Sequence, residues 1–302
     1  MANTTKNDVS SLIQPGINTL FMENYVEYSK NQDYQKIASI ISSNHEAENY
    51  SWLTDSPSMR EFIGEREIKA VSQNKYSLTN KTWEATLGIE RSVLEDENYG
   101  QLKMRINDLA YNVVKHKNKL VIDTLVAGNT TKCFDNSNFF ANDHTYSGKS
   151  DFKGTQSNIG NLPLTYANLK TTISNMRKFK GTNGEPLNIK PTTLVVPMDL
   201  EWTAKELVYS SQIDTSNTKN VLQGALEVIV SPYIESPTSW YLLDCSGVMK
   251  PLILQERCKV ELTSLGGESE EGFMRDLYLF GVRARYNAGY GYWQKAYLNK
   301  PN

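Results

Sequence analysis

The chain has 302 residues, a formal net charge of -2 and a hydrophobic content of 39%, which fits one large domain or two ordinary ones. The near-neutral charge argues against a sequence-specific nucleic-acid-binding protein. The three cysteines form no Cys-x-x-Cys pair, so we expect neither a disulfide framework nor a thiolate metal site. The polar first sixteen residues and the lack of long apolar runs lead us to expect no signal peptide and no membrane span.

The N-terminal part predicts short helical segments. Apolar and aromatic residues recur near helical spacing between residues 16 and 28, and a second short segment contains Tyr34, Ile37 and Ile40 or Ile41. This part is too small to hold a core of its own. We therefore expect an N-terminal arm that packs on another part of the molecule.

Residues 66–78 and 81–92 predict two strands joined around residues 79–81. In the second strand, Trp83, Ala85, Leu87 and Ile89 alternate with mostly polar residues, which is the period of a strand with one buried face. A two-stranded hairpin is marginally stable alone in water. We expect this hairpin to lie against another subunit or domain.

A long helix should follow the hairpin. The acidic residues 95–97 suit a helix N-terminus, apolar residues recur at helical spacing from Leu102 to Leu125, and Gly128 is a plausible stop. Such a helix would be about 40 Å long. Its later part carries Lys115, Lys117 and Lys119, which form either a solvated face or a set of phosphate contacts.

The remaining chain predicts an α+β fold, because helices and strands alternate without repeating as βαβ units. The expected elements are a loop over 129–163, helices over 165–179 and 199–209, a buried strand over 193–196, a polar loop over 210–220, strands near 225–231, 239–244 and 251–263, a glycine-rich loop over 265–272 and a last strand over 276–296.

Charged residues of alternating sign precede the first predicted strand. Arg60, Glu61, Glu65 and Arg66 lie within one short run. A general base is one interpretation, but no histidine or nucleophile lies nearby in sequence, so ion pairing on an exposed or intersubunit loop is favoured. These four residues, together with Trp83 and Glu84, are our candidates for intersubunit contacts.

Asp143 and His144, with Asp135 nearby, suggest a metal site or a hydrolytic site. The chain has three histidines and no His-Glu-x-x-His motif, so a structural loop histidine is favoured. We predict no catalytic, cofactor-binding or metal-binding residue, and no cofactor.

Two other motifs receive the simpler interpretation. Glu268, Glu270 and Glu271 could bind a cation but more simply form a solvated turn. Gly289 and Gly291 open no helix and so form no phosphate loop; they should bend the terminal strand.

Six stretches, in order, resemble the major head (capsid) subunits of Mu-like phages and prophages, within the tailed-phage capsid class with the Hong Kong 97 fold. They are Tyr50-Ser51-Trp52-Leu53 with Pro57 and the Arg-Glu-Phe-Ile-Gly-Glu-Arg run from Arg60, WEATLGIERSVLEDENYG at 83–100, FDNSNFFANDH at 134–144, GEPLNIKPTTLVVPMDLEWTAKEL at 184–207, WYLLDCSGVMKPLILQER at 240–257 and FGVRARYNAGYGYWQKA at 280–296.

The resemblance implies a division of the chain into five parts. They are an N-terminal arm (1–56), an extended E-loop (57–97), a peripheral P-domain with the spine helix (98–162), an axial A-domain (163–250) and a return to the P-domain (251–302). The family's motif residues are structural, so the resemblance implies no catalytic residue.

It also implies a major capsid protein that self-assembles as pentamers and hexamers into an icosahedral head enclosing double-stranded DNA, which it contacts non-specifically. Expected partners are copies of the chain, a scaffold, a portal and a maturation protease, without a membrane. The expected location is the virion capsid, after synthesis in the bacterial host cytoplasm. The alternatives are an encapsulin-like compartment and, third, a hydrolytic enzyme using Asp143 and His144.

Overall fold

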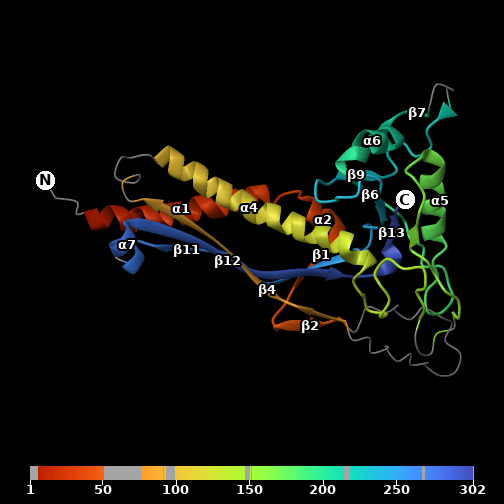
Figure 1. Cartoon of the computed structure of the whole chain (residues 1–302), viewed down its shortest axis with the longest axis horizontal. Coiled ribbons are helices and arrows are strands. Elements are labelled where there is room, and N and C mark those ends of the chain that lie inside the picture. The colour runs from red at the N-terminus through yellow and green to blue at the C-terminus, as the bar shows by residue number, and fades with distance from the viewer. Residues whose placement is uncertain are drawn as a thin grey trace, which may run out of the picture.

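The structure is a computed structural model that describes residues 6–50, 76–90, 92, 99–146, 150, 152–213, 218–266 and 269–301. Figure 1 shows a long body, in which helices run beside long strands, and a compact end that contains shorter elements. Within the described ranges, no helix is both long enough and apolar enough to cross a membrane.

The body is built on a four-stranded sheet in the order β1-β11-β12-β4. Its strands are β1 (Ala38–Ser42), β11 (Leu252–Leu265), β12 (Leu277–Tyr290) and β4 (Lys81–Glu90). β1 runs parallel to β11, and the other neighbours are antiparallel. The short helix α7 (Glu270–Arg275) connects β11 to β12 at the far end of the body (Figure 1).

Two long helices cover this sheet, α1 (Lys6–Tyr28) and α4 (Tyr99–Val126) (Figure 1). The buried apolar residues of α4 recur at three- and four-residue spacing, as predicted. The chain then forms the 3-10 turn η1 (Ala127–Asn129). A Cβ on Gly128 would lie 2.9 Å from Phe140 Cδ2, so glycine is required here by close packing. Helix α4 ends at Val126, close to the predicted stop, but Gly128 does not have a positive φ; its role is to leave room for the rings of Phe139 and Phe140.

Residues 66–75 of the predicted hairpin lie outside the described residues, and its described part pairs with other segments. β4 shows the predicted alternation of burial, but it pairs with β12, while β3 (Ser77–Thr79) pairs with β2 (Ala47–Asn49). Only Asn80 separates β3 from β4, and a hairpin needs a turn of about two residues or more. The Asn80 amide donates instead to Ser43 Oγ at 3.0 Å and to the His45 carbonyl at 2.9 Å. These bonds hold the chain where it passes from one sheet to the other.

The compact end contains a five-stranded sheet in the order β5-β13-β10-β6-β9. These strands are β5 (Ile159–Gly160), β13 (Ala296–Asn299), β10 (Trp240–Leu243), β6 (Thr193–Val196) and β9 (Glu227–Val230). Every residue of β6, β10 and β13 is buried, so both faces of the sheet are covered.

Helices flank this sheet. Helix α5 (Tyr166–Arg177) packs beside β13, and α6 (Glu201–Tyr209), which follows the 3-10 turn η2 (Met198–Leu200), packs on β6 and β9. A small pair, β7 (Gln212–Ile213) and β8 (Thr218–Lys219), extends from the domain. The predicted helices and strands of this region are confirmed to within a few residues.

The predicted short first helix is the 23-residue α1, and the expected polar loop over 210–220 contains β7 and β8. Three further expectations are wrong in detail. The second N-terminal segment is a short helix, α2 (Asp33–Ile37), that continues into β1. The expected glycine-rich loop gives way to α7 at Glu270. The last strand is divided: β12 ends at Tyr290, the 3-10 turn η4 (Trp293–Lys295) follows, and β13 joins the other sheet. Gly291 lies at this crossover, where a Cβ would approach the Lys250 carbonyl oxygen to 2.7 Å.

Candidate functional site

A buried ion pair joins the two long helices to the sheet. Lys117 of α4 has a side chain that is 4% exposed, and its ammonium group pairs with Glu256 of β11. It also donates to the Tyr25 hydroxyl of α1 at 2.8 Å and lies 5.2 Å from the centre of the Tyr286 ring of β12. Burial disfavours the charge, but interaction with Tyr25 and Glu256 outweighs it and raises the pKa of Lys117. Lys117 therefore stays charged and fixes α1 against the body.

The buried position of Lys117 corrects the expectation that all three lysines lie on a solvated or phosphate-contacting face of α4. Lys115 and Lys119 are exposed, whereas Lys117 is buried. Lys119 also forms an ion pair with Asp123 of the same helix. Lys117 is therefore unavailable for phosphate contacts.

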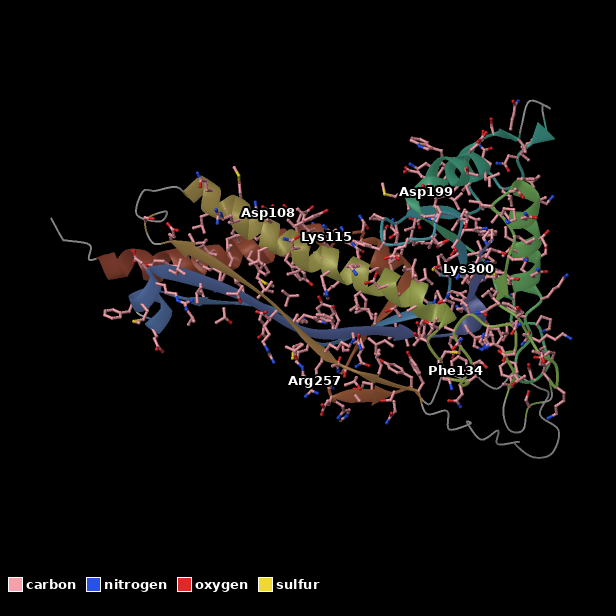
Figure 2. The ribbon with its side chains drawn as sticks, viewed as in Figure 1. Asp108, Lys115, Phe134, Asp199, Arg257 and Lys300 are labelled. Carbon is pink, nitrogen blue, oxygen red and sulfur yellow. The ribbon has the colours of Figure 1, made fainter. Side chains whose placement is uncertain are left out.

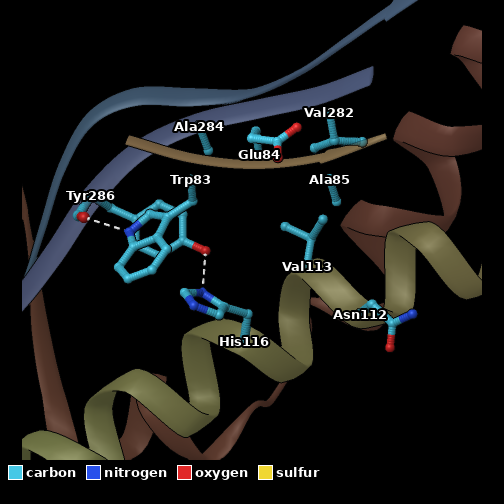
Figure 3. A pocket seen from close by; sticks show the side chains of 9 residues that line it. All are labelled: Trp83, Glu84, Ala85, Asn112, Val113, His116, Val282, Ala284 and Tyr286. Atoms are coloured by element: carbon cyan, nitrogen blue, oxygen red, sulfur yellow. Dashed lines mark hydrogen bonds between the residues drawn. The ribbon is translucent and has the colours of Figure 1, made fainter. Parts of the chain in front are cut away.

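An aromatic pocket lies beside this junction, between β4, β12 and α4 (Figure 3). Trp83 donates from its indole nitrogen to the Tyr286 carbonyl at 2.9 Å, and its ring lies 4.3 Å from that of His116. His116 Nδ1 lies 2.8 Å from the Tyr286 hydroxyl. The pocket has a volume of about 210 Å³ and is lined by Trp83, Glu84, Ala85, Asn112, Val113, His116, Val282, Ala284 and Tyr286.

The pocket offers little chemistry. Burial and the positive charge of Lys119 lower the pKa of His116, so its imidazole is neutral near pH 7. Glu84 is its one lining carboxylate, and its side chain is exposed opposite Arg283 of β12. Trp83 is committed to contacts in its own chain. A contact of Glu84 or Trp83 with a neighbouring subunit remains a prediction.

The other four candidates for intersubunit contact, Arg60, Glu61, Glu65 and Arg66, lie outside the described residues. The described chain stops at Tyr50 and resumes at Tyr76, and the amide of Tyr50 donates to the Tyr76 carbonyl at 2.8 Å. The segment between them therefore begins and ends at adjacent points.

His144 is fully buried and held on three sides. Its Nδ1 lies 2.6 Å from Asp135 Oδ2, its Nε2 lies 3.1 Å from Asn158 Oδ1, and its ring stacks on Trp293 with ring centres 3.9 Å apart. Asp143 is exposed, so Asp135 is the carboxylate that meets His144. The arrangement that the hydrolytic alternative needs, Asp143 beside His144, is not formed.

Cys133, Asp135 and His144 place their ligand atoms within 4.8 Å of one another. These atoms already bond to each other, since the Cys133 thiol donates to Asp135 Oδ1 at 3.0 Å. Burial raises the pKa of that thiol, which favours the protonated form, and a structural zinc site normally has four ligands. The geometry supports a structural role for His144, as a brace between the loop after α4 and Trp293.

The predicted carboxylate turn is only partly described. Glu268 lies outside the described residues, Glu270 begins α7 and is exposed, and the side chain of Glu271 is not described. The described residues therefore favour neither a cation site nor a solvated turn.

Sequence reasoning missed the exposed apolar side chains at the two ends of the molecule. Phe273 and Met274 of α7 are 86% and 73% exposed, and Trp202 of α6 is 76% exposed. A tryptophan and a methionine flanked by acidic residues over 198–206 were the available signal. A contiguous exposed apolar patch marks a surface that meets a partner, whereas single exposed apolar side chains are common.

A family model described as the Mu-like prophage major head subunit gpT matches residues 11–163, 160–234 and 235–302. The chain is 28% identical over 303 aligned residues to the Mu-like prophage FluMu major head subunit of Haemophilus influenzae, covering 99% of this chain and 75% of that protein. It is 29% identical over 264 residues to the major capsid protein of Escherichia phage Mu, covering 87% of this chain and 65% of that protein.

Solved capsid structures agree. The procapsid protein of bacteriophage JBD30 is 27% identical with a TM-score of 0.58, covering 97% of this chain and 76% of that chain. The JBD30 capsid protein is 25% identical with a TM-score of 0.52, covering 67% and 90%. A virus-like particle from Pyrococcus furiosus, 13% identical with a TM-score of 0.53 over 93% and 98%, shares the fold.

These matches confirm the predicted α+β phage capsid fold and the prediction of a structural protein in place of an enzyme. They extend along nearly the whole chain, so neither conclusion depends on a single motif. The chain belongs to the family of Mu-like prophage major head subunits, the major capsid proteins of Mu-like phages.

Proposed function

We propose that this major capsid protein assembles as pentamers and hexamers into an icosahedral head that encloses double-stranded DNA. The observation that carries the proposal is the family match from residue 11 to residue 302, together with a likeness to a procapsid protein over 97% of the chain. The long body and the compact end offer well-separated surfaces, and repeated modest interfaces can close into a shell.

The parts of the chain receive roles within this proposal. Residues 57–97 act as the E-loop; within it β3 and β4 pair with strands of their own chain, and the residues that precede β3 lie over a neighbour. Residues 98–162 and 251–302 form the P-domain around α4. Residues 163–250 form the A-domain, next to the five- and six-fold axes. Residues 1–56 are the arm, and the Lys117 junction with Tyr25 supports this role because it fastens α1 to the body.

The proposed partners follow from the same role. They are other copies of the chain, a scaffold, a portal and a maturation protease during assembly, and packaged DNA contacted without sequence preference. A net charge of -2 suits a container that must not hold its DNA tightly. The subunit is made in the host cytoplasm and ends in the virion capsid.

An encapsulin-like compartment is the second candidate, supported by the shared fold with the Pyrococcus furiosus particle. The higher identity to phage JBD30 proteins favours the phage head. Particles that contain a defined cargo protein and lack nucleic acid, isolated from the native host, would favour the compartment.

Charge reversal in the loop tests the assembly role. Arg60→Glu and Arg66→Glu should leave the monomer folded, by circular dichroism, while reducing the yield of shells in negative-stain micrographs. Lys115→Glu, an exposed charge reversal on α4, is the matched control. Normal shells from both arginine variants would refute the assignment of these charges to subunit contacts.

A further inference from the structure

Helix α5 presents a basic face to solvent. Residues 152–184 contain five basic residues and no acidic residue. Lys170, Thr171, Ser174 and Lys178 are exposed, at the spacing of one helix face. A shallow groove of about 470 Å³ runs along this face, between Tyr166 and Lys178. Neither Lys170 nor Lys178 forms an ion pair within the described part of the chain.

The segment formed by η2 and α6 presents an exposed face with acidic residues, in contrast to the basic face of α5. Met198, Asp199, Trp202 and Glu206 are all exposed, and their spacing places them on one side of the helix. Glu201 and Lys205 form an ion pair with each other. No ion pair involves Asp199 or Glu206 among the described residues. The face therefore has Met198 and Trp202 at its centre with Asp199 and Glu206 beside them, and the ammonium group of Lys205 lies 5.2 Å from the centre of the Trp202 ring.

The two faces lie apart within one copy. α5 packs beside β13, near one edge of the five-stranded sheet, and α6 packs on β6 and β9, toward the opposite edge. Figure 1 shows α5 and α6 on different sides of the compact end, and Figure 2 shows Asp199 on the side away from α5. Complementary surfaces at two different places on one subunit produce head-to-tail contacts, which close into rings.

We propose that the acidic, apolar α6 face of one copy docks on the basic α5 face of the next copy, head to tail, within each ring of the shell. The inference rests on the proposed assembly function and names the partner surface of each helix. Trp202 is the apolar anchor that enters the groove beside Lys170, because exposed tryptophans at interfaces dominate binding. Asp199 and Glu206 face Lys170 and Lys178, which sets register and excludes the wrong orientation.

Charge reversal with rescue tests the contact. Lys170→Glu with Lys178→Glu places acidic residues on both faces, and Asp199→Lys with Glu206→Lys places basic residues on both. Each double variant should lower the assembled fraction by about tenfold or more, since like charges face each other. The quadruple variant restores complementarity and should restore assembly. Sedimentation and negative-stain microscopy measure the assembled fraction.

The control is Lys190→Glu with Glu235→Lys, which alters two exposed residues outside both helices. It should assemble as the wild type does. If the wild type forms shells and both double variants do so equally well, the contact is wrong while the assembly function stands. If the double variants fail and the quadruple variant also fails, with all three folded by circular dichroism, charge pairing between these faces is wrong.

Disulfide trapping gives a readout that does not depend on shell formation. Ser174→Cys and Thr203→Cys place thiols on the exposed parts of the two faces. Under mild oxidation the double variant should give a ladder of covalent oligomers on a non-reducing gel, whereas each single variant should give none of that ladder. A double variant that remains monomeric at the concentration where the wild type associates would overturn the proposal.

Discussion

Removing the buried ammonium group of Lys117 should destabilise the subunit strongly. Lys117→Met keeps much of the side-chain volume but leaves Glu256 without its partner, and breaking a buried ion pair costs about 3–5 kcal/mol. The Glu256 side chain is 25% exposed, so solvent lowers the expected cost to about 2–4 kcal/mol. Urea unfolding of the unassembled subunit, followed by circular dichroism, measures this loss.

The double variant Lys117→Met with Glu256→Met is the matched control. It should be more stable than the single variant, since an apolar pair of similar volume can replace a buried ion pair at little cost. The pKa of Lys117 is raised on folding, so its contribution is complete below the unfolded pKa of about 10.4 and is lost as pH rises through the folded value. A single variant within about 0.5 kcal/mol of the wild type at pH 7 would refute the reasoning.

Three further predictions use the same unfolding measurement. Gly128→Ala should cost about 1–3 kcal/mol, since the new methyl group would meet Phe140 at 2.9 Å; no loss would show that the ring can move aside. His144→Phe keeps a ring against Trp293 but removes the hydrogen bond of His144 to the buried carboxylate of Asp135, which keeps its bonds from Cys133 and Ser137; the cost should be about 1.5–3 kcal/mol. Burial raises the pKa of Asp135, but its interactions with His144 outweigh burial and lower that pKa. The stability that this carboxylate contributes is therefore present above the unfolded pKa of about 3.9 and is lost as pH falls through the folded value. A loss of stability in His144→Phe that is equally large at pH 2 and pH 7 would contradict this reasoning. Trp83→Phe removes the bond to the Tyr286 carbonyl and should cost about 1–2 kcal/mol, and full retention of stability would show that water replaces the indole.

The elements that periodicity predicted well are those whose buried face is long. Helix α4 and strand β4 each repeat their apolar residues over ten positions or more, at periods of about 3.6 and 2. Their existence and their buried faces could therefore be predicted. Their partners could not, because pairing of β4 with β12 depends on contacts between segments far apart in the chain.

Short elements were predicted less well, because they have too few residues to show a period. Ile40 and Ile41 form a brief apolar run that periodicity cannot assign to helix or strand, and pairing of β1 with β11 decides it. For Lys117 the sequence predicted a solvated face or a phosphate contact, because its partner Glu256 comes much later in the chain. A lysine carries no local sign of whether an acidic residue will meet it.

The candidate contact surfaces also differ in how far the sequence alone could predict them. Trp83 was a candidate for an intersubunit contact, and its indole donates a hydrogen bond within its own chain. The basic face of α5 could have been found by counting charges over residues 152–184, which include no acidic residue. The face of α6 required the structure, because exposure of Trp202 depends on which side of the helix meets β6 and β9.

Cryo-electron microscopy of particles formed by the purified protein tests the central claim most directly. The proposed function predicts closed icosahedral shells in which residues 163–250 surround the five- and six-fold axes and α6 of one copy contacts α5 of the next. A monodisperse monomer under all assembly conditions, or shells in which residues 163–250 lie away from these axes, would contradict it.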